Sequence, residues 1–418
     1  MTILIKSVTL DGSIQDIFLE DGVIREISQN CERKADRVIS GRNRAALPSF
    51  INGHTHAAMT LFRGYADDLP LKHWLEGKIW PLEGKLTEED VYWGAKLACL
   101  EMIKNGITVF NDMYWQWEAT ALAVKEMGLR GFISAVFIDR FDGNKSAEQI
   151  DLNVRLFEIA KQYLPWVTFT FGPHAIYTVS RKSLEWIRDF SLEENISIHM
   201  HLSETEDEVH FSKQKYSLSP VEFLDSIGVL SDRFIGCHGC FLDENDCSIL
   251  KRSGSTLVHM PVSNLKLAVG RIFPYALVKN HDIPFCLGTD GCASNNSLDL
   301  IETMKFAALL AKFSTQNPTM MPAREAVDHA TKTAAHMFGL GEWDIKVGAN
   351  SDIILIDLAR PEMTPDFDVY SNLVYASNGS IVDTVICMGQ VLMENRVVPG
   401  EKDILKNSSK MAKSLVNR

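Results

Sequence analysis

The sequence has no apolar run of membrane-spanning length, no low-complexity segment and no excess of positive charge. It contains 42 Lys and Arg against 54 Asp and Glu, which gives a formal net charge of -12. Because an acidic surface repels the phosphate backbone, we expect no nucleic-acid partner. The chain starts with the strand-like residues 3–5 and lacks a basic region followed by an apolar core. These features predict a cytoplasmic protein without a membrane partner.

Paired cysteine motifs are also lacking. The eight cysteines are scattered, and the one C-x-x-C arrangement, Cys237 to Cys240, has no second pair of similar spacing. Several cysteines lie in apolar segments, as Cys286 does, where a thiol behaves as a small hydrophobic group. The sequence therefore predicts buried free thiols and not a zinc knuckle or a redox pair.

The middle of the chain alternates apolar strand-like runs with amphipathic helical patterns, such as that of residues 88–102. The candidate strands end near His56, Asp112, Asp139, His174, His201, His238, Ser263 and Asp290. After the first gap the spacing is about 20 to 40 residues, the size of a β–α repeat. The prediction is an α/β fold with a parallel (β/α)8 barrel. An open doubly wound sheet competes, but it normally binds its ligand at one switch point and not at many strand ends.

The two ends of the chain consist of short strands and turns. Asp21-Gly22 separates two alternating runs, which is a hairpin signal. Strand-like runs return at residues 352–357 and 382–391, and we expect no helices between them. Residues 1–49 and 348–418 are therefore predicted to form one small composite β-sandwich domain, with residues 50–347 as the inserted barrel. The tail from Lys406 is predicted to be a frayed surface helix.

Polar side chains collect at the predicted strand ends. Alternate residues of a strand point to the same side, so the imidazoles of His54 and His56 project together. The carboxyl ends of all barrel strands open onto one face. The residues expected on that face are His54, His56, His174, His201, Glu204, His238, Asn264 and Asp290. Any one of them could merely cap a helix or hold a loop, but together they predict a functional site.

These residue types favour a catalytic metal centre. His54, His56 and His201 would supply nitrogen ligands and Asp290 a carboxylate ligand to one divalent ion, leaving a position for water. A zinc-bound water loses its proton near neutral pH and becomes a nucleophile. Asp290 can accept that proton, and His238 can hold the nucleophile by a hydrogen bond. Glu204 is the natural acid/base group, moving a proton onto a ring nitrogen of the substrate.

Four segments together resemble the amidohydrolase superfamily: Pro48–His56 (PSFINGHTH), Ile198–Thr205 (IHMHLSET), Cys237–Gly239 (CHG) and Leu287–Gly291 (LGTDG). The closer resemblance is to its aminohydrolase branch, the 5-methylthioadenosine/S-adenosylhomocysteine deaminases and their relatives, over almost the whole chain. It implies one zinc ion, or iron as the alternative, and hydrolytic release of ammonia from a purine-like ring. His174 stands where binuclear members have a carboxylated lysine, which favours a single metal ion.

The resemblance also implies substrate contacts. Trp74 matches a loop tryptophan that lines the pocket, and Glu83 matches a glutamate that grips the ribose hydroxyls. His174 matches a histidine that touches the adenine ring, Glu204 approaches the same ring, and Ser294 matches a serine near the base. Purely structural roles stay open for Trp74 as loop core, Glu83 as a helix-start acid and Ser294 as a cap.

The stretch around the third barrel strand departs from the family pattern. Members that handle S-adenosylhomocysteine use arginines there to hold the amino-acid carboxylate, but residues 131–139 contain none. Arg140 and Lys145 follow in a different register, where a solvated loop charge is the expected role. The sequence therefore argues against recognition of a homocysteine tail, and a smaller 5-substituted adenosine, or adenosine itself, becomes at least as good a candidate.

The predicted function is a zinc-dependent deaminase that attacks C6 of an adenosine-type nucleoside: 5-methylthioadenosine, S-adenosylhomocysteine, adenosine or 5-deoxyadenosine. The alternative is a related hydrolase of guanine, another amino-heterocycle or a chlorotriazine. Glu83 separates the two, because a base without ribose has no diol for it to hold. A metal-binding protein without turnover is a third hypothesis, which Glu204 and His238 argue against. By analogy of fold, a homo-oligomer is compatible with these predictions.

Overall fold

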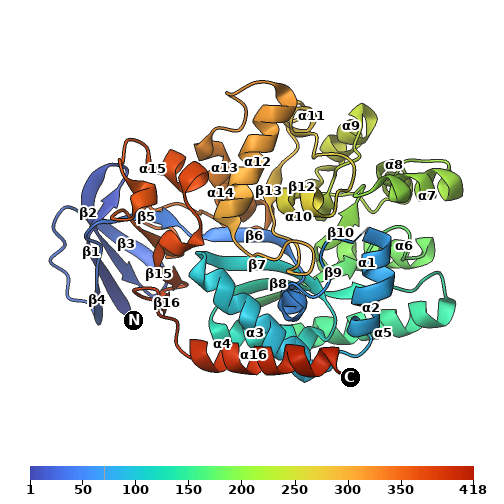
Figure 1. The fold of residues 1–418 in the computed structure, drawn as a ribbon, viewed down its shortest axis with the longest axis horizontal. Helices are drawn as coiled ribbons and strands as arrows, with labels where there is room; N and C mark the ends of the chain where they lie inside the picture. Colours follow the sequence, from blue (N-terminus) through green and yellow to red (C-terminus); the bar gives the residue numbers. More distant parts are fainter. Residues whose placement is uncertain (70) are drawn as a thin grey trace.

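The computed structural model describes residues 1–69 and 71–418 and contains two eight-stranded sheets. The first is parallel and forms the nearly closed barrel at the centre of Figure 1. Its strands, in spatial order, are β13 (Phe285–Leu287), β12 (Thr256–His259), β11 (Phe234–His238), β10 (Ile198–Leu202), β9 (Val167–Pro173), β8 (Arg130–Phe137), β7 (Ile107–Tyr114) and β6 (Phe50–Thr55). Nearly all residues of these strands are buried, as expected for parallel strands covered by helices. The predicted barrel is confirmed.

The barrel closes where β6 meets β13. The amide of Asp290 donates to the carbonyl of His54 at 3.0 Å. Across the seam, Asn52 Nδ2 donates to Thr289 Oγ1 and the backbone amide of Thr289 donates to Asn52 Oδ1. Gly288 is required at this seam, because a Cβ atom there would lie 2.9 Å from the backbone nitrogen of His54. The first and last strands of the barrel are therefore held at the point where the first predicted ligand lies.

The second sheet combines both ends of the chain, as the sequence predicted, and lies at one end of the barrel (Figure 1). Its strands are β1 (Thr2–Leu10), β2 (Ser13–Glu20), β3 (Val23–Ser28), β4 (Arg37–Ser40), β5 (Arg44–Pro48), β14 (Ile353–Asp357), β15 (Val382–Cys387) and β16 (Gln390–Met393). The order is β16-β15-β14-β5-β1-β2-β3, with β4 beside β1. The antiparallel pair β5–β14 joins the N-terminal and C-terminal strands. Strands β2 and β3 form the predicted hairpin around Asp21-Gly22.

Helices surround the barrel. Those between the barrel strands are η1 (Ala57–Phe62), α1 (Leu71–Trp74), η2 (Leu75–Ile79), α2 (Trp80–Glu83), α3 (Glu88–Lys104), α4 (Trp117–Met127), α5 (Gly143–Ala160), η3 (Lys161–Tyr163), α6 (Arg181–Glu194), α7 (Glu206–Tyr216), α8 (Pro220–Ser226), α9 (Glu244–Ser253), α10 (Pro261–Lys266) and α11 (Tyr275–Asn280). After β13 come α12 (Leu300–Thr315), α13 (Ala323–Ala330), α14 (Lys332–Met337), η4 (Pro361–Met363), α15 (Val369–Ser371), η5 (Asn372–Ala376), η6 (Gly379–Ile381) and α16 (Glu401–Val416). Within the described ranges, none of these helices has the length and apolar character that a bilayer crossing requires.

Three local predictions were wrong. Strand β12 ends at His259 and not near Ser263, because Pro261 begins α10 and a proline favours the first helical position. The segment between β14 and β15 is not free of helices, since η4, α15, η5 and η6 lie there. The tail from Lys406 is not frayed: it continues α16, which packs along α3 and buries Leu415 completely (Figure 1).

Candidate active site

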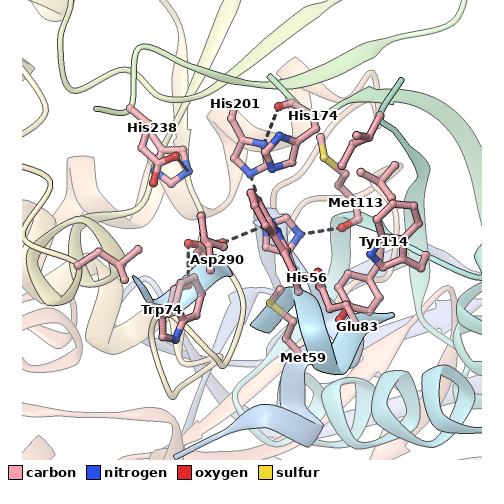
Figure 2. Close-up of a pocket in the computed structure, with 18 of the residues that line it drawn as sticks. His56, Met59, Trp74, Glu83, Met113, Tyr114, His174, His201, His238 and Asp290 are labelled. Carbon is pink, nitrogen blue, oxygen red and sulfur yellow. Dashed lines mark hydrogen bonds and ion pairs between the residues drawn. The ribbon is translucent and has the colours of Figure 1, made fainter. Parts of the chain in front are cut away.

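A cavity of about 760 Å³, partly open to solvent, lies at the carboxyl ends of the barrel strands. Figure 2 shows its floor, where His56, His201, His238 and Asp290 point toward one another; they come from the residue after β6, from β10, from β11 and from the turn after β13. The wall carries predicted residues too: Trp74, Glu83, His174, Glu204 and Ser294 all line the cavity. His54 lies beneath the floor and is completely buried. The structure thus gathers every predicted site residue into one region.

The four predicted ligands lie at mutual distances that suit one metal ion. Asp290 Oδ1 is 3.4 Å from His54 Nε2 and 3.3 Å from His56 Nε2, and the Nε2 atoms of His56 and His201 are 3.4 Å apart. Two ligand atoms at about 2.0–2.1 Å from a tetrahedral zinc ion would be about 3.3 Å apart. His54 Nε2 is also buried without a hydrogen-bond partner among the described residues. The donor set therefore fits a divalent ion.

Backbone carbonyls fix two of the imidazoles in the ligating tautomer. His56 Nδ1 lies 2.7 Å from the carbonyl oxygen of Met113, and His201 Nδ1 lies 2.8 Å from that of His174 (Figure 2). A carbonyl only accepts, so both Nδ1 atoms carry the proton and both Nε2 lone pairs face the cavity floor. These orienting groups belong to the ends of β7 and β9 and leave no signal in the sequence.

Asp290 is held as an ionised carboxylate. Its Oδ2 accepts hydrogen bonds from Ser263 Oγ at 2.6 Å and Ser294 Oγ at 2.7 Å, while Oδ1 faces His54 and His56. Burial raises the pKa of Asp290, but the neighbouring imidazoles outweigh this effect and hold that pKa well below its usual range. Ser263 was not predicted as a site residue. Ser294 lines the cavity as expected, but in this structure its hydroxyl donates a hydrogen bond to Asp290.

Two site residues adopt left-handed backbone conformations that non-glycine residues rarely use. His238 has φ 76° and Asp290 has φ 64°. Such conformations cost about 1–2 kcal/mol each and cluster at functional sites, where the surrounding structure enforces them. At both positions the backbone turns at the end of the strand, and the side chain of His238 or Asp290 is directed at the cavity floor (Figure 2). His238 is fixed further by a 2.8 Å contact between its Nδ1 and Asn264 Oδ1.

Glu204 lies on the cavity wall beside the ligand cluster. Its Oε2 is 3.8 Å from His238 Nε2, and burial raises the pKa of its carboxyl, although the nearby imidazole of His238 opposes the shift. Its backbone amide donates to Glu208 Oε2 at 2.8 Å, and the amide of Ser203 donates to the other oxygen at 2.9 Å. Glu208, which the sequence analysis did not single out, therefore fixes the backbone that carries Glu204.

The opposite wall is aromatic and carries a second carboxyl. Glu83 lies beside Tyr114 in Figure 2, and burial raises the pKa of Glu83 while Tyr114 and nearby His56 counter it. Trp74 is 6% exposed and belongs to the apolar cluster under this wall. The side chain of His174 is half-buried, and burial lowers its pKa to about 3, so it faces the cavity as a neutral imidazole.

The two basic residues left open by the sequence do not line this cavity in the part of the chain that the structure describes. Arg140 is exposed, and its guanidinium lies 5.6 Å from the ring centre of Trp80, which is itself a lining residue. Lys145 lies in the first turn of α5, where its backbone amide is capped by Asp142. Arg140 is therefore a loop charge, and Lys145 is a charge at the start of a helix.

Comparisons with known proteins identify a matching family model, close relatives in sequence and a similar solved structure. The model of the amidohydrolase family matches residues 45–392. A 5'-deoxyadenosine deaminase of Methanospirillum hungatei is 44% identical, with 99% of this chain and 94% of the relative covered. A 5-methylthioadenosine/S-adenosylhomocysteine deaminase of Archaeoglobus fulgidus is 45% identical, with 91% of each chain covered. The crystal structure of a zinc-bound adenosine deaminase from Xanthomonas campestris superposes with a TM-score of 0.93 at 30% identity, covering 100% of this chain and 98% of that one.

The buried carboxyl of Glu208 leads to a prediction about stability. Burial raises its pKa to about 7, above the ordinary value of 4.5, so the folded state holds a proton that the unfolded chain releases. The stability linked to this proton is complete below pH 4.5 and is lost as the pH rises through 7. We expect the free energy of unfolding of Glu208→Gln, measured by urea titration, to fall less between pH 4.5 and 7 than that of the unmodified protein.

The matched control is Glu206→Gln, an exposed carboxylate in the first turn of the same helix α7. This variant should follow the pH profile of the unmodified protein. Parallel profiles for all three proteins would contradict the raised pKa of Glu208.

Proposed function

Because the chain belongs to the amidohydrolase family, we propose that it is a metal-dependent hydrolytic deaminase that acts at C6 of adenosine-type nucleosides. One observation carries the proposal: the carboxyl of Glu204 and the imidazole of His238 lie beside the four proposed ligands at the floor of a cavity. A protein that only stored metal would need neither group. The names of the relatives support an adenosine-type substrate.

His54, His56, His201 and Asp290 would hold one divalent ion, which we propose to be zinc, with iron as the alternative. Three nitrogen ligands and one carboxylate are the donor set of catalytic zinc sites. The ion, when bound, supplies Lewis-acid activation of a water molecule near neutral pH. All other steps of the proposed reaction belong to side chains of the cavity.

His238 and Asp290 would act on the attacking water. With Nδ1 of His238 turned to Asn264, its Nε2 is free to accept a hydrogen bond from the water and to aim it at C6. Asp290 is ionised and can take the proton that the water loses as its oxygen bonds to C6. Its two serine partners hold the carboxylate in place during this transfer.

Glu204 would move the proton that the ring requires. Its raised pKa keeps a proton available for N1 of the base while the C6–oxygen bond forms. Asp290 can then give the proton that it took from the water to the C6 amino group, so that the C6–nitrogen bond breaks and ammonia leaves. The C6 hydroxyl passes its proton to Glu204 as the carbonyl forms, which restores both carboxyl groups to their starting states. The product is the corresponding inosine-type nucleoside.

The far wall would bind the rest of the nucleoside. Glu83 can accept hydrogen bonds from both ribose hydroxyls, with Tyr114 as its neighbour. Trp74 would line the pocket, His174 would touch the base and Ser294 would lie near it. Because Met113, Val136 and Ile138 line the cavity and Arg140 does not, we propose a small, apolar 5'-substituent in preference to a homocysteine tail.

A cytoplasmic location and the absence of a nucleic-acid partner stay part of the proposal, and the net charge of -12 supports the second of these. A homo-oligomer stays a prediction.

A substrate screen tests the function directly. Zinc-loaded protein should release ammonia from 5'-deoxyadenosine, 5-methylthioadenosine and adenosine. For S-adenosylhomocysteine, adenine and guanine, kcat/KM should be at least about tenfold lower. Each of these three compounds lacks or misplaces a contact worth about 1.4 kcal/mol or more. The change in ultraviolet absorbance on deamination gives the rates. Preference for guanine, or turnover of a chlorotriazine alone, would instead support the alternative substrate class.

Glu204→Gln should retain the metal and lose about 10²–10⁴-fold in kcat, because one positioned acid/base group contributes that much. Metal content by elemental analysis and single-turnover rates give the two readouts. Exposed Glu206→Gln is the control and should match the unmodified enzyme. Loss of metal from Glu204→Gln, or full activity in that variant, would contradict the acid/base role.

Glu83→Gln should lower kcat/KM for adenosine about 10- to 100-fold, since hydrogen bonds to a charged group contribute about 1.5–3 kcal/mol. When 2',3'-dideoxyadenosine replaces adenosine, kcat/KM of this variant should fall only slightly further. The kcat/KM of the unmodified enzyme should fall strongly with the same change of substrate. Glu76→Gln, exposed on η2, is the control. An equal response of both enzymes to the missing hydroxyls would show that Glu83 does not hold the diol.

A further inference from the structure

His199 is a fully buried imidazole in the barrel that no step of the proposed reaction uses. It lies on β10 two residues before His201, and therefore on the same side of the strand. Its Nε2 is 2.7 Å from His54 Nδ1 and 3.1 Å from Cys237 Sγ. Among the described residues its Nδ1 has no hydrogen-bond partner. A buried imidazole with one nitrogen in close contact and the other without a partner is uncommon and requires an explanation.

The three proposed histidine ligands differ in what holds their second nitrogen. His56 and His201 each face a backbone carbonyl, at 2.7 and 2.8 Å, which can only accept a proton. His54 faces the side chain of His199, whose nitrogen either donates or accepts according to its tautomer. The ligating form of His54 is therefore the one that the backbone does not fix.

We propose that His199 is the positioning residue that keeps His54 in its ligating tautomer. In this arrangement His54 Nδ1 donates its proton to His199 Nε2, and the proton of His199 resides on Nδ1. The lone pair of His54 Nε2 is then free for the ion. In the reverse arrangement His199 would donate, and the proton of His54 would sit on Nε2, between the ring and Asp290. The inference rests on the proposed metal centre.

The thiol of Cys237 has a secondary place in this arrangement. His199 Nε2 has no proton to give when it accepts from His54, so Cys237 can only be a second, weaker donor to the same nitrogen. The role of Cys237 would thus be packing beside His199, and its membership of a C-x-x-C sequence has no further meaning here.

His54, His199 and Cys237 could alternatively be read as ligands of a second ion, since their donor atoms lie within 4.8 Å of one another. The distances favour the hydrogen bond. Nitrogen atoms that share a tetrahedral zinc ion are about 3.3 Å apart, as the ligand atoms on the cavity floor are. The 2.7 Å between His54 Nδ1 and His199 Nε2 is the length of a hydrogen bond.

The test compares His199→Leu, which removes the acceptor, with His199→Gln, whose side-chain oxygen can replace Nε2. Zinc affinity of the metal-free protein is measured by competition with a chromogenic chelator, and stoichiometry by elemental analysis. We expect His199→Leu to bind zinc about 10- to 100-fold more weakly, the usual effect of losing a group that orients a metal ligand. His199→Gln should recover most of that loss.

The matched control is His259→Leu. His259 is also a buried histidine at a barrel strand, but it stacks on Phe273 with ring centres 4.4 Å apart and touches no proposed ligand in the described structure. The His259→Leu variant should bind zinc with the same affinity as the unmodified protein. Thermal unfolding of each variant separates loss of affinity from loss of folding.

A measurement on the unmodified protein does not depend on any variant folding. In zinc-loaded, 15N-labelled protein, the imidazole of His199 should carry its proton on Nδ1 and none on Nε2 in two-bond 1H–15N NMR spectra. A proton on His199 Nε2 would overturn the proposal, as would unchanged zinc affinity in a folded His199→Leu. Two zinc ions per chain, with the second lost on substitution of His199, would overturn it in favour of the second site.

These failures differ from failure of the proposed function. If the unmodified protein bound no zinc and released no ammonia, the metal centre itself would be wrong. If the unmodified protein bound one zinc ion and deaminated nucleosides, and His199→Leu bound zinc with the same affinity, only the proposed role of His199 would be wrong.

Discussion

The proposed metal centre requires three imidazoles and one carboxylate to direct their lone pairs at the same point, without a proton between them. Leaving buried acceptors unpaired costs about 1–3 kcal/mol each, so a fold built for stability alone would turn these groups away from one another. Here the carbonyls of Met113 and His174, two serines and the ring of His199 hold them facing inward. A bound divalent ion would offset that cost, which links metal binding to the stability of the barrel floor.

The barrel provides this convergence because the carboxyl ends of its parallel strands open onto one face and the first strand meets the last. Ligands from β6 and from the turn after β13 are adjacent only because those two strands meet, although 236 positions separate His54 from Asp290 in the sequence. The seam is narrow: Gly288 approaches the backbone of His54, and the amide of Asp290 is bonded to the His54 carbonyl. A side chain at Gly288 would separate the first ligand from the last.

Sequence reasoning reached the site because strand ends carry the chemistry in this architecture, and strand ends can be recognised from apolar runs followed by histidine or aspartate. It missed what the sequence does not encode locally. The carbonyls that orient His56 and His201 have no residue signature. His199 has such a signature, since it forms a second H-x-H with His201 and strand alternation places both side chains on one side. The end of β12 lies before the predicted position because Pro261 begins α10.

Two carboxyls in one cavity, Glu204 and Glu83, would let the proposed metal centre act on a particular substrate. Burial raises the pKa of both, but their neighbours differ: Glu204 faces His238 at the cavity floor, and Glu83 faces Tyr114 at the wall. In the proposed reaction, Glu204 would serve any ring that carries an amino group beside a nitrogen that can be protonated. Glu83 would instead bind the group that is attached to that ring. Because the two are held by different elements, β10 with its following loop and α2, the wall can change with substrate while the floor keeps its chemistry.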